Sequence, residues 1–286
     1  MSAILTIARL TVAEAGRRRI VWVLLGLTLL TVGLTTWGVE RLVSLARQGV
    51  SSELEVSAGV SQVLILVAFM FSFVLAMTAA FLGAPAIAAD LESGIAHAML
   101  ARPIRRGDLV VGRWLGLVAI VVAYAAGSGL LEISGVRLVT GYSPPEPLLA
   151  VAFLSAQAVV LLTMALLLST RLPAIAAGAI CVVFFGLGWM AGVFAGIGRA
   201  FDAGPLVGAA EASRWLLPTD GLWRGTIYSL EPPLVVLVAL GRGGPAVHAN
   251  PFFASAPPPT GFLAWCAIWI AITLALSVVS LTRRDL

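Results

Sequence analysis

The chain contains six apolar runs of about 20 residues without a charged side chain, and no other feature restricts its fold as strongly. A helix needs about 20 such residues to cross the hydrocarbon core of a bilayer, which is about 30 Å thick. Only 11% of the residues are charged, against about 25% in an ordinary soluble domain. We therefore predict a single all-α polytopic membrane domain over residues 1–286, with transmembrane helices at about 20–39, 60–82, 114–131, 148–169, 172–197 and 261–281.

A seventh apolar stretch, at 232–240, is too short to span a bilayer. Its length suits a re-entrant or interfacial segment, or part of a folded loop outside the membrane. The first long run is interpreted as a permanent helix and not as a signal peptide, because it is longer than the apolar region of such a peptide.

The arginines predict the orientation of these helices. All 18 basic residues are arginine, since the chain has no lysine. With the N-terminus inside, eleven arginines and five acidic residues lie on the cytoplasmic side, a net charge of +6, and seven arginines and nine acidic residues lie outside, a net charge of −2. The positive-inside rule thus predicts a multi-pass protein of the cell membrane with both termini in the cytoplasm. This topology accounts for the basic balance, which therefore does not indicate nucleic-acid binding.

The first 19 residues place small and apolar side chains on one helical face, ahead of three consecutive arginines. This pattern predicts an amphipathic helix that lies along the cytoplasmic interface. The alternative is a basic leader that only sets the topology.

The segment 85–113 is the longest cytoplasmic connection. We expect a helix that has Asp90 and Glu92 in its first turn, where the helix dipole favours negative charge. Pro103 should end this helix, since a proline disfavours the α conformation of the residue before it. Asp108 is expected to cap the next helix, which leads into the third span.

The outer region 198–260 contains several Gly-Pro and Pro-Pro turn signals and one clear helix, which runs through Tyr228. Thr219 or Asp220 can accept hydrogen bonds from its first free N–H groups, and Glu231 with the two prolines after it should end it. We expect this cap to involve Pro218, Thr219, Asp220 and Arg224.

Three glycines spaced by four residues, Gly188, Gly192 and Gly196, form a small-residue ridge on the fifth span. Such a ridge permits close approach of another helix, which can belong to a partner subunit or to the same chain. Glu132 follows the third span and can be a pathway or proton-relay acid, but its place at the outer boundary near Arg137 favours a solvated carboxylate at the interface.

Three short motifs carry a family resemblance. Glu92-Ser93-Gly94, the stretch Leu100-Ala101-Arg102-Pro103-Ile104-Arg105-Arg106 and the stretch Gly112-Arg113-Trp114-Leu115-Gly116 together resemble the cytoplasmic loop of ABC-2 type transporter permeases. The outer Pro218-Thr219-Asp220 with Arg224 is similar to a segment of the branch that includes the permease of nitrous-oxide reductase maturation. Ile95 and Arg113 depart from the usual Thr and Lys of the loop pattern.

The resemblance implies a membrane-spanning permease subunit of an ATP-driven ABC transporter, in a family that is mainly exporters. It implies that two permeases, identical or related, form the pathway, and that each docks on a cytoplasmic ATP-binding subunit. The chain itself is then not an enzyme and holds no cofactor, and ATP and Mg are expected on the partner. The absence of lysine agrees, because a Walker A loop needs a lysine. The expected coupling residues are Asp90, Glu92, Gly94, His97, Leu100, Arg102, Pro103, Arg105 and Arg106.

Two alternatives stay open at this point. The arginines of the loop can be topology charges that contact anionic lipid, in addition to or in place of coupling residues. The whole chain can also be an anchor or assembly subunit of a respiratory or maturation complex, with no pathway of its own. Catalytic and metal sites are not expected, since the only histidines, His97 and His248, lie on opposite sides of the membrane, and Cys181 and Cys266 fall within spans.

Overall fold

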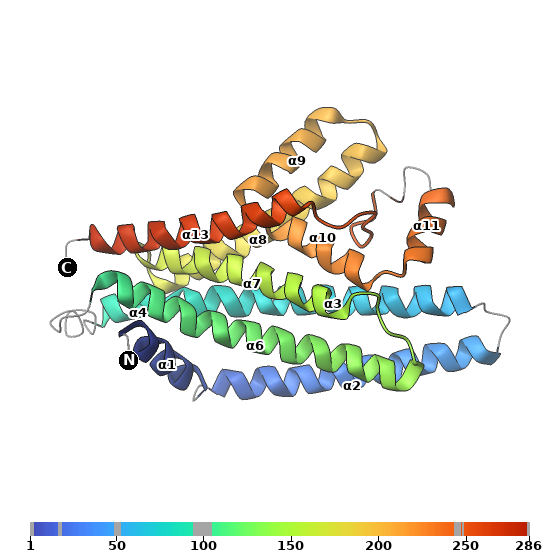
Figure 1. Ribbon diagram of the computed structural model, residues 1–286, viewed down its shortest axis with the longest axis horizontal. Coiled ribbons are helices and arrows are strands. Elements are labelled where there is room, and N and C mark those ends of the chain that lie inside the picture. The colour runs from blue at the N-terminus through green and yellow to red at the C-terminus, as the bar shows by residue number, and fades with distance from the viewer. Residues whose placement is uncertain are drawn as a thin grey trace.

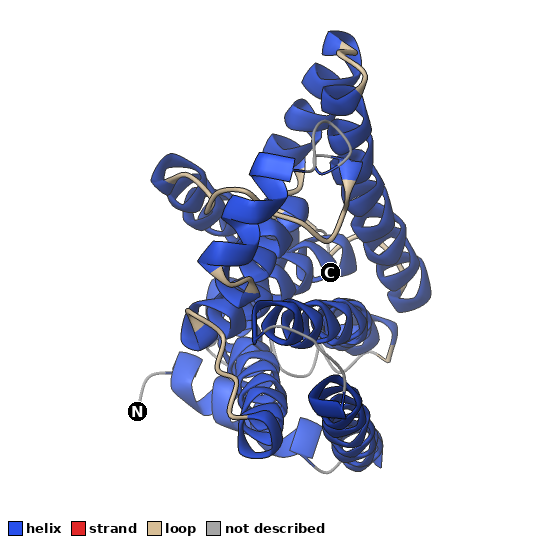
Figure 2. Ribbon diagram, turned by 90° about the vertical axis from the view of Figure 1, so that its right-hand side faces the viewer, coloured by secondary structure: helices blue, strands red, loops and turns tan. Residues whose placement is uncertain are grey.

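The computed structural model describes residues 3–16, 19–48, 53–93, 105–242, 247 and 249–284. Within these residues the chain forms eleven helices and no strand (Figures 1 and 2). The helices are α1 Ala3–Gly16, α2 Arg19–Gln48, α3 Glu53–Gly83, α4 Pro85–Glu92, α6 Arg106–Thr140, α7 Pro147–Ser169, α8 Ala174–Ala200, α9 Gly204–Leu216, α10 Thr219–Leu230, α11 Pro233–Arg242 and α13 Thr260–Thr282. The predicted all-α class is confirmed.

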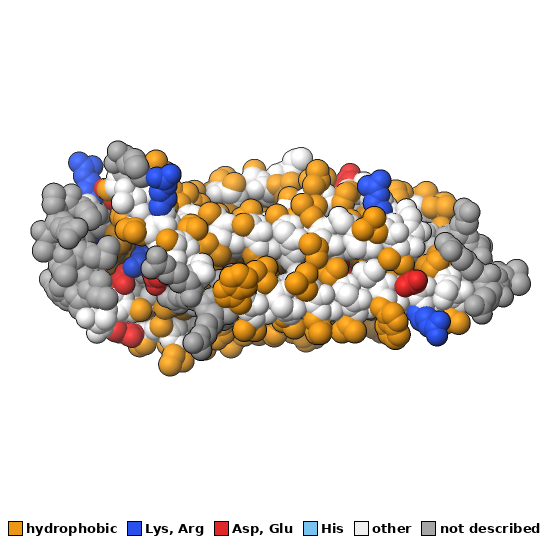
Figure 3. Space-filling model, turned by 90° about the horizontal axis from the view of Figure 1, so that it is seen from below, with side chains coloured by type: hydrophobic (Ala, Val, Ile, Leu, Met, Phe, Trp, Pro, Cys, Tyr) orange, Lys and Arg blue, Asp and Glu red, His pale blue; other side chains and the backbone are white. Residues whose placement is uncertain are grey.

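Six helices of the described part are long and apolar enough to cross a membrane, namely α2, α3 with its continuation α4, α6, α7, α8 and α13. They overlap the six predicted runs, so the predicted multi-pass architecture is confirmed. Figure 3 shows one face of the bundle, on which charged side chains lie toward the two ends and hydrophobic side chains occupy the middle. This distribution fits a bilayer around the middle of the bundle.

Several of these helices are longer than the apolar runs that predict them. Helix α6 has 35 residues, which at a rise of 1.5 Å per residue corresponds to about 50 Å, well beyond the hydrocarbon core. It continues past Glu132 and Arg137 and ends at Gly141, whose φ of 73° is left-handed and whose N–H bonds to the carbonyl of Arg137. The first charged residues after the apolar run therefore do not mark the end of α6.

Helix α7 is the centre of the bundle. More than half of its residues are buried, and it packs against α3, α6, α8, α10 and α13. Helices α2 and α13 are far less buried and expose many large apolar side chains, which suits contact with lipid. A four-residue turn, 170–173, joins α7 to α8.

Both chain termini lie at one end of the bundle, which we call the terminal end, and α11 lies at the opposite, distal end (Figure 1). The predicted helix of the first 19 residues is present as α1, and it packs against α6. Its placement along the membrane interface stays a prediction.

The described part of the region 201–260 contains three helices, where the turn signals indicate one. Helix α9 begins at the Gly204-Pro205 turn signal, because a proline suits the first turn of a helix, and it packs against α8. Helix α10 ends before Glu231 as predicted, and ten of its twelve residues are buried, among α7, α8 and α3. The short stretch 232–240 forms most of α11, which is largely exposed.

Candidate functional site

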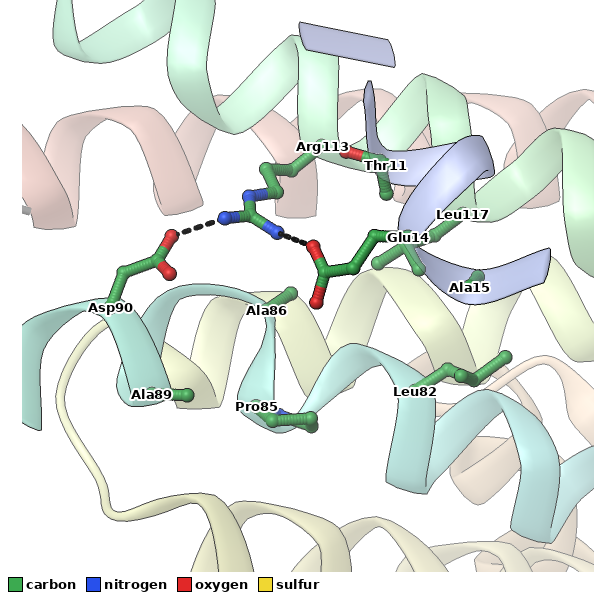
Figure 4. A pocket seen from close by; sticks show the side chains of 10 residues that line it. All are labelled: Thr11, Glu14, Ala15, Leu82, Pro85, Ala86, Ala89, Asp90, Arg113 and Leu117. Atoms are coloured by element: carbon green, nitrogen blue, oxygen red, sulfur yellow. Dashed lines mark hydrogen bonds and ion pairs between the residues drawn. The ribbon is translucent and has the colours of Figure 1, made fainter. Parts of the chain in front are cut away.

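An arginine between two carboxylates ties three helices together at the terminal end. Arg113 of α6 donates from Nη2 to Oδ2 of Asp90 on α4 over 2.5 Å, and from Nη1 to Oε2 of Glu14 on α1 over 3.3 Å. Figure 4 shows the guanidinium between the two acids. The side chains of Arg113 and Asp90 are only 16% and 13% exposed, whereas that of Glu14 is 53% exposed. The pair with Asp90 is therefore the better shielded of the two. We call these three residues the Arg113 cluster.

Two glycines on either side of Arg113 let α1 approach α6 closely. A Cβ added at Gly112 would lie 2.7 Å from Cβ of Ile7, and one at Gly116 would lie 2.7 Å from the carbonyl oxygen of Ala8. Both distances are shorter than van der Waals contact, so only glycine fits these two positions. The spacing of four residues places both glycines on one face of α6, which is the face that receives α1.

The residue after Arg113 anchors α6 to the centre of the bundle. The indole Nε1 of Trp114 donates to Oγ1 of the fully buried Thr163 on α7 over 2.9 Å. The stretch Gly112-Arg113-Trp114-Leu115-Gly116 thus supplies contacts to α1, α4 and α7 from little more than one helical turn.

Arg106, at the start of α6, holds the end of α13. Its Nη1 donates to the carbonyl oxygens of Leu281, Thr282 and Arg284 over 3.2, 3.1 and 2.8 Å. These carbonyls belong to the end of α13, where a helix leaves its last acceptors unsatisfied and carries a partial negative charge. Arg106 therefore has a structural role that its place in the loop motif did not indicate.

The turn between α7 and α8 also contacts the end of α13. Arg171 donates from Nε to the hydroxyl of Ser280 over 3.0 Å and from Nη2 to its carbonyl oxygen over 3.0 Å. In the other direction, Nη1 of Arg284 donates to the carbonyl of Thr170 over 2.6 Å. The terminal ends of α6, α7, α8 and α13 are thus connected through arginine.

These contacts correct three sequence-based expectations. Asp90 and Glu92 lie in the last turn of α4 and not in the first turn of a later helix, because the helix already begins at Pro85. Asp90 is stabilised there by Arg113 instead of the helix dipole. Asp108 lies inside the first turn of α6, which begins at Arg106 without a side-chain cap.

The connection between α4 and α6 joins two helices that are held together by the ion pair of Asp90 with Arg113. Residues 94–104 lie outside the described residues, and with them Gly94, His97, Leu100, Arg102 and Pro103. Glu92 and Ser93 precede this segment and Arg105 follows it, all three in the described part, with Ser93 and Arg105 exposed. The ion pair of Asp90 with Arg113 therefore joins the two helices that border the predicted coupling segment.

At the distal end, Asp220 is also shared between two arginines. Its Oδ2 accepts from Nε of Arg214 over 2.7 Å and from Nε of Arg224 over 3.2 Å, and its side chain is 4% exposed. Arg224 also donates from Nη2 to the carbonyl of Gly192 on α8 over 2.8 Å. The predicted helix cap is wrong, because α10 has no side-chain cap and Asp220 points to the arginines of α9 and α10 instead.

The glycine ridge of α8 receives α10 of the same chain. A Cβ at Gly188 would lie 2.9 Å from Oγ1 of Thr219, and one at Gly192 would overlap the carboxylate of Asp220. Gly196 is buried as well. Of the two roles left open for this ridge, the structure shows packing within the chain at Gly188 and Gly192.

With this geometry in place, comparison with known proteins gives one decisive result. The family model for ABC-2 family transporter proteins matches residues 5–286, nearly the whole chain. The chain belongs to the ABC-2 transporter family. No curated protein matches it closely. Membership makes the chain a membrane permease subunit of an ABC transporter, and it accords with the six spanning helices.

Glu132 of this permease is not the solvated acid that its place near Arg137 predicts. Its side chain is 4% exposed, and its carboxylate lies beside the hydroxyl of Thr35 on α2. The reason is that α6 continues for two more turns and carries Glu132 inside the bundle, beside Leu64 of α3 and Leu154 of α7. Both cysteines of the permease are buried, as expected for apolar packing.

A second buried acid lies where α10 ends. Glu231 is 6% exposed, and burial raises its pKa to about 7, against the smaller opposite effect of a hydrogen bond from the backbone of Ala254. Burial, and then the charge of Glu231, raises the pKa of the nearby Tyr142 to about 12. The hydroxyl of Tyr142 donates to the carbonyl of Leu230 over 3.1 Å. The connection after α6 is therefore attached to the end of α10.

Proposed function

We propose that this permease works with a separate ATP-binding subunit that docks on the segment 94–104 and its borders at Glu92 and Arg105. Closure of the ATP-binding subunit would move α4 and α6 together, since the Arg113 cluster joins them and also joins them to α1. Rigid-body movement of packed elements is a common form of such transmission. The observation that supports this proposal is the ion pair of Asp90 with Arg113, which joins the two helices on either side of the docking segment.

The energy source is assigned to the partner on chemical grounds. The chain has no lysine, and a Walker A loop uses a lysine on the β- and γ-phosphates. ATP and Mg would therefore bind to the ATP-binding subunit, and this chain would bind neither.

The topology is proposed from the charge distribution. Eleven of the 18 arginines precede the first span, follow the last one or lie in the two connections on the same side. By the positive-inside rule, the terminal end of the bundle would face the cytoplasm, and the permease would lie in the plasma membrane. The docking segment lies on that side, where ATP is available.

Three further features rest on the family resemblance. Two copies of this permease, or this chain and a related one, would form the pathway between them, and transport would be outward. The Pro218-Thr219-Asp220 segment with Arg224 supports a place in the branch that resembles the permease of nitrous-oxide reductase maturation. In this chain that segment holds α10 against α8 and α9.

The test is co-purification. The full chain would be isolated from its own membranes in mild detergent, and the proteins that accompany it would be identified. We expect a P-loop ATPase with the wild-type chain, and its loss from a variant that combines Glu92→Ala, Leu100→Ala and Arg102→Ala. The matched control is Arg137→Ala, since Arg137 is exposed and lies toward the distal end of α6, and this variant should retain the ATPase.

One result would contradict the proposal. If the wild-type chain is isolated intact without any ATPase, or if the triple variant retains the ATPase in full, the segment 94–104 is not the docking surface. The chain would then be interpreted as an anchor or assembly subunit.

A further inference from the structure

Three arginines from three helices line one cavity at the distal end. The cavity has a volume of about 490 Å³, and its lining includes Arg199 of α8, Arg214 of α9 and Arg224 of α10. The acidic residues of this region are Asp220, which is buried beneath Arg214 and Arg224, and Glu211, which also lines the cavity. With three guanidinium groups and two carboxylates, the site has a net charge of +1.

The donors of this cavity are not all used by the protein. Arg214 donates from Nε to Asp220, and its Nη2, which has no hydrogen-bond partner among the described residues, is buried and does not face the cavity. Arg199 approaches Glu211 only to 3.9 Å, too far for a hydrogen bond, and it lines the cavity together with Arg214 and Arg224. An unsatisfied guanidinium beside like charges is stabilised by a bound anion.

Most of the remaining lining is apolar. Trp215, Phe262 and the three prolines 257–259 supply an apolar wall, beside the polar Ser255. An anion that carries an apolar body suits such a cavity better than a free inorganic ion, because the apolar part is removed from water by this wall.

Tryptophans lie beside the cavity, as is typical at the depth of lipid headgroups. The rings of Trp215 and Trp265 lie 5.5 Å apart, and Nε1 of Trp265 donates to the carbonyl of Trp215 over 3.0 Å. Trp269, one turn further along α13, donates to the carbonyl of Leu216 over 2.8 Å. Tryptophans gather at the interface between membrane and water, and α13 begins at Thr260, next to the cavity.

We propose that this cavity binds the phosphate of an anionic membrane lipid, with Arg199 as its principal donor. The glycerol and first acyl carbons would contact Trp215 and Phe262. The inference depends on the distal arginines alone, so it stands whether or not an ATPase docks at the terminal end.

The experiment measures lipid binding to the purified full-length chain by native mass spectrometry. The probes are phosphatidylglycerol, phosphatidylcholine and inorganic phosphate, each titrated separately. We expect saturable binding of one phosphatidylglycerol in preference to phosphatidylcholine. Arg199→Gln should weaken it about fivefold, the factor that corresponds to about 1 kcal/mol for one arginine near a lipid surface. Glu211→Gln should strengthen it, since it removes a competing carboxylate.

Arg137→Gln is the matched control, because it removes the same charge from an exposed position at the distal end of α6. The fold should survive Arg199→Gln, whose side chain makes only one long ion pair, and the midpoint of thermal unfolding checks this. Equal weakening by Arg199→Gln and Arg137→Gln would overturn the proposal. Inorganic phosphate that binds as tightly as phosphatidylglycerol would overturn the assignment to a lipid, and so would equal affinity for the two lipids.

Discussion

Arg113 and Asp90 are 23 positions apart and form a 2.5 Å ion pair that closes the segment between α4 and α6. One partner precedes the segment and the other follows it. Both are largely shielded from solvent, so the pair is not a surface ion pair of the kind that contributes little to stability. Glu14 adds α1 to the same guanidinium. This arrangement makes α1, α4 and α6 a unit at the terminal end.

Removal of either partner of this pair should destabilise the permease. We expect Arg113→Gln and Asp90→Asn each to lower the free energy of unfolding by about 1–3 kcal/mol. Arg113→Gln leaves the shielded Asp90 without its partner, and Asp90→Asn leaves Arg113 with only the longer contact to the more exposed Glu14. The double variant should lose less than the sum of the two single losses. Arg113→Lys should be milder, since it keeps the positive charge between the acids.

The measurement is thermal unfolding of the purified chain in detergent, combined with ATP hydrolysis in the assembled complex. Glu14→Gln is the matched control, as Glu14 is more exposed and its contact is longer, and its effect should be the smallest. Strictly additive losses for Arg113→Gln and Asp90→Asn would show that the two residues do not act as a pair.

The glycines of α6 should tolerate substitution only where nothing approaches them. Gly116→Val is expected to push α1 away from α6 and to cost about 1–3 kcal/mol, the usual range for overpacking, because the added atoms would overlap Ala8 and Thr11. Gly127→Val on the same helix should be nearly neutral, since nothing lies within 4 Å of a Cβ there. Limited proteolysis and thermal unfolding would check both variants, and similar behaviour of the two would rule out tight packing of α1 at Gly116.

The stability of the permease should depend on the protonation of Glu231. Its pKa is raised from 4.5 to about 7 in the folded chain, so the folded state holds this proton more tightly than the unfolded state. Stability should therefore fall as the pH rises from about 4.5 through about 7. Glu231→Gln should flatten this part of the profile and raise the unfolding midpoint above pH 7. An unchanged pH profile of the unfolding midpoint in Glu231→Gln would contradict the assignment.

The orientation can be tested with single cysteines, because both native cysteines are buried. Ser93→Cys adds a thiol at the end of α4, and Ser143→Cys adds one after α6, both at exposed positions. In intact cells a membrane-impermeant maleimide should label only Ser143→Cys, and it should label Ser93→Cys after permeabilisation. The opposite pattern would place the terminal end of the bundle outside the cell.

Local sequence signals predicted the spanning helices well, because hydropathy over about 20 residues reflects the thickness of the bilayer directly. They did not predict how far α6 continues beyond the apolar run, since a helix that leaves the bilayer is limited by its C-cap at Gly141 and not by hydropathy. Glu132 was placed at the interface for this reason. Helix α9 was missed because Gly204-Pro205 also begins a helix.

The contacts of the candidate site depend on which helix faces meet, and this is not a local property of the sequence. Asp220 has the position of a helix cap. Its carboxylate instead accepts a hydrogen bond from Arg214 of α9 and lies against Gly192 of α8. The spacing of Gly112 and Gly116 does indicate a close helix contact, but not that α1 is the helix that fills it. Arg113 is part of the loop motif, but the motif does not show that its side chain binds Glu14 of α1.

Contact between the segment 94–104 and an ATP-binding subunit can be measured by site-specific crosslinking. Leu100→Cys would be crosslinked in native membranes with a short bifunctional reagent, with Ser143→Cys at the opposite end as the control. We expect a crosslinked product between Leu100→Cys and a P-loop ATPase, and none from Ser143→Cys. Absence of that product, or equal yields from the two positions, would show that the ATPase does not dock on this segment.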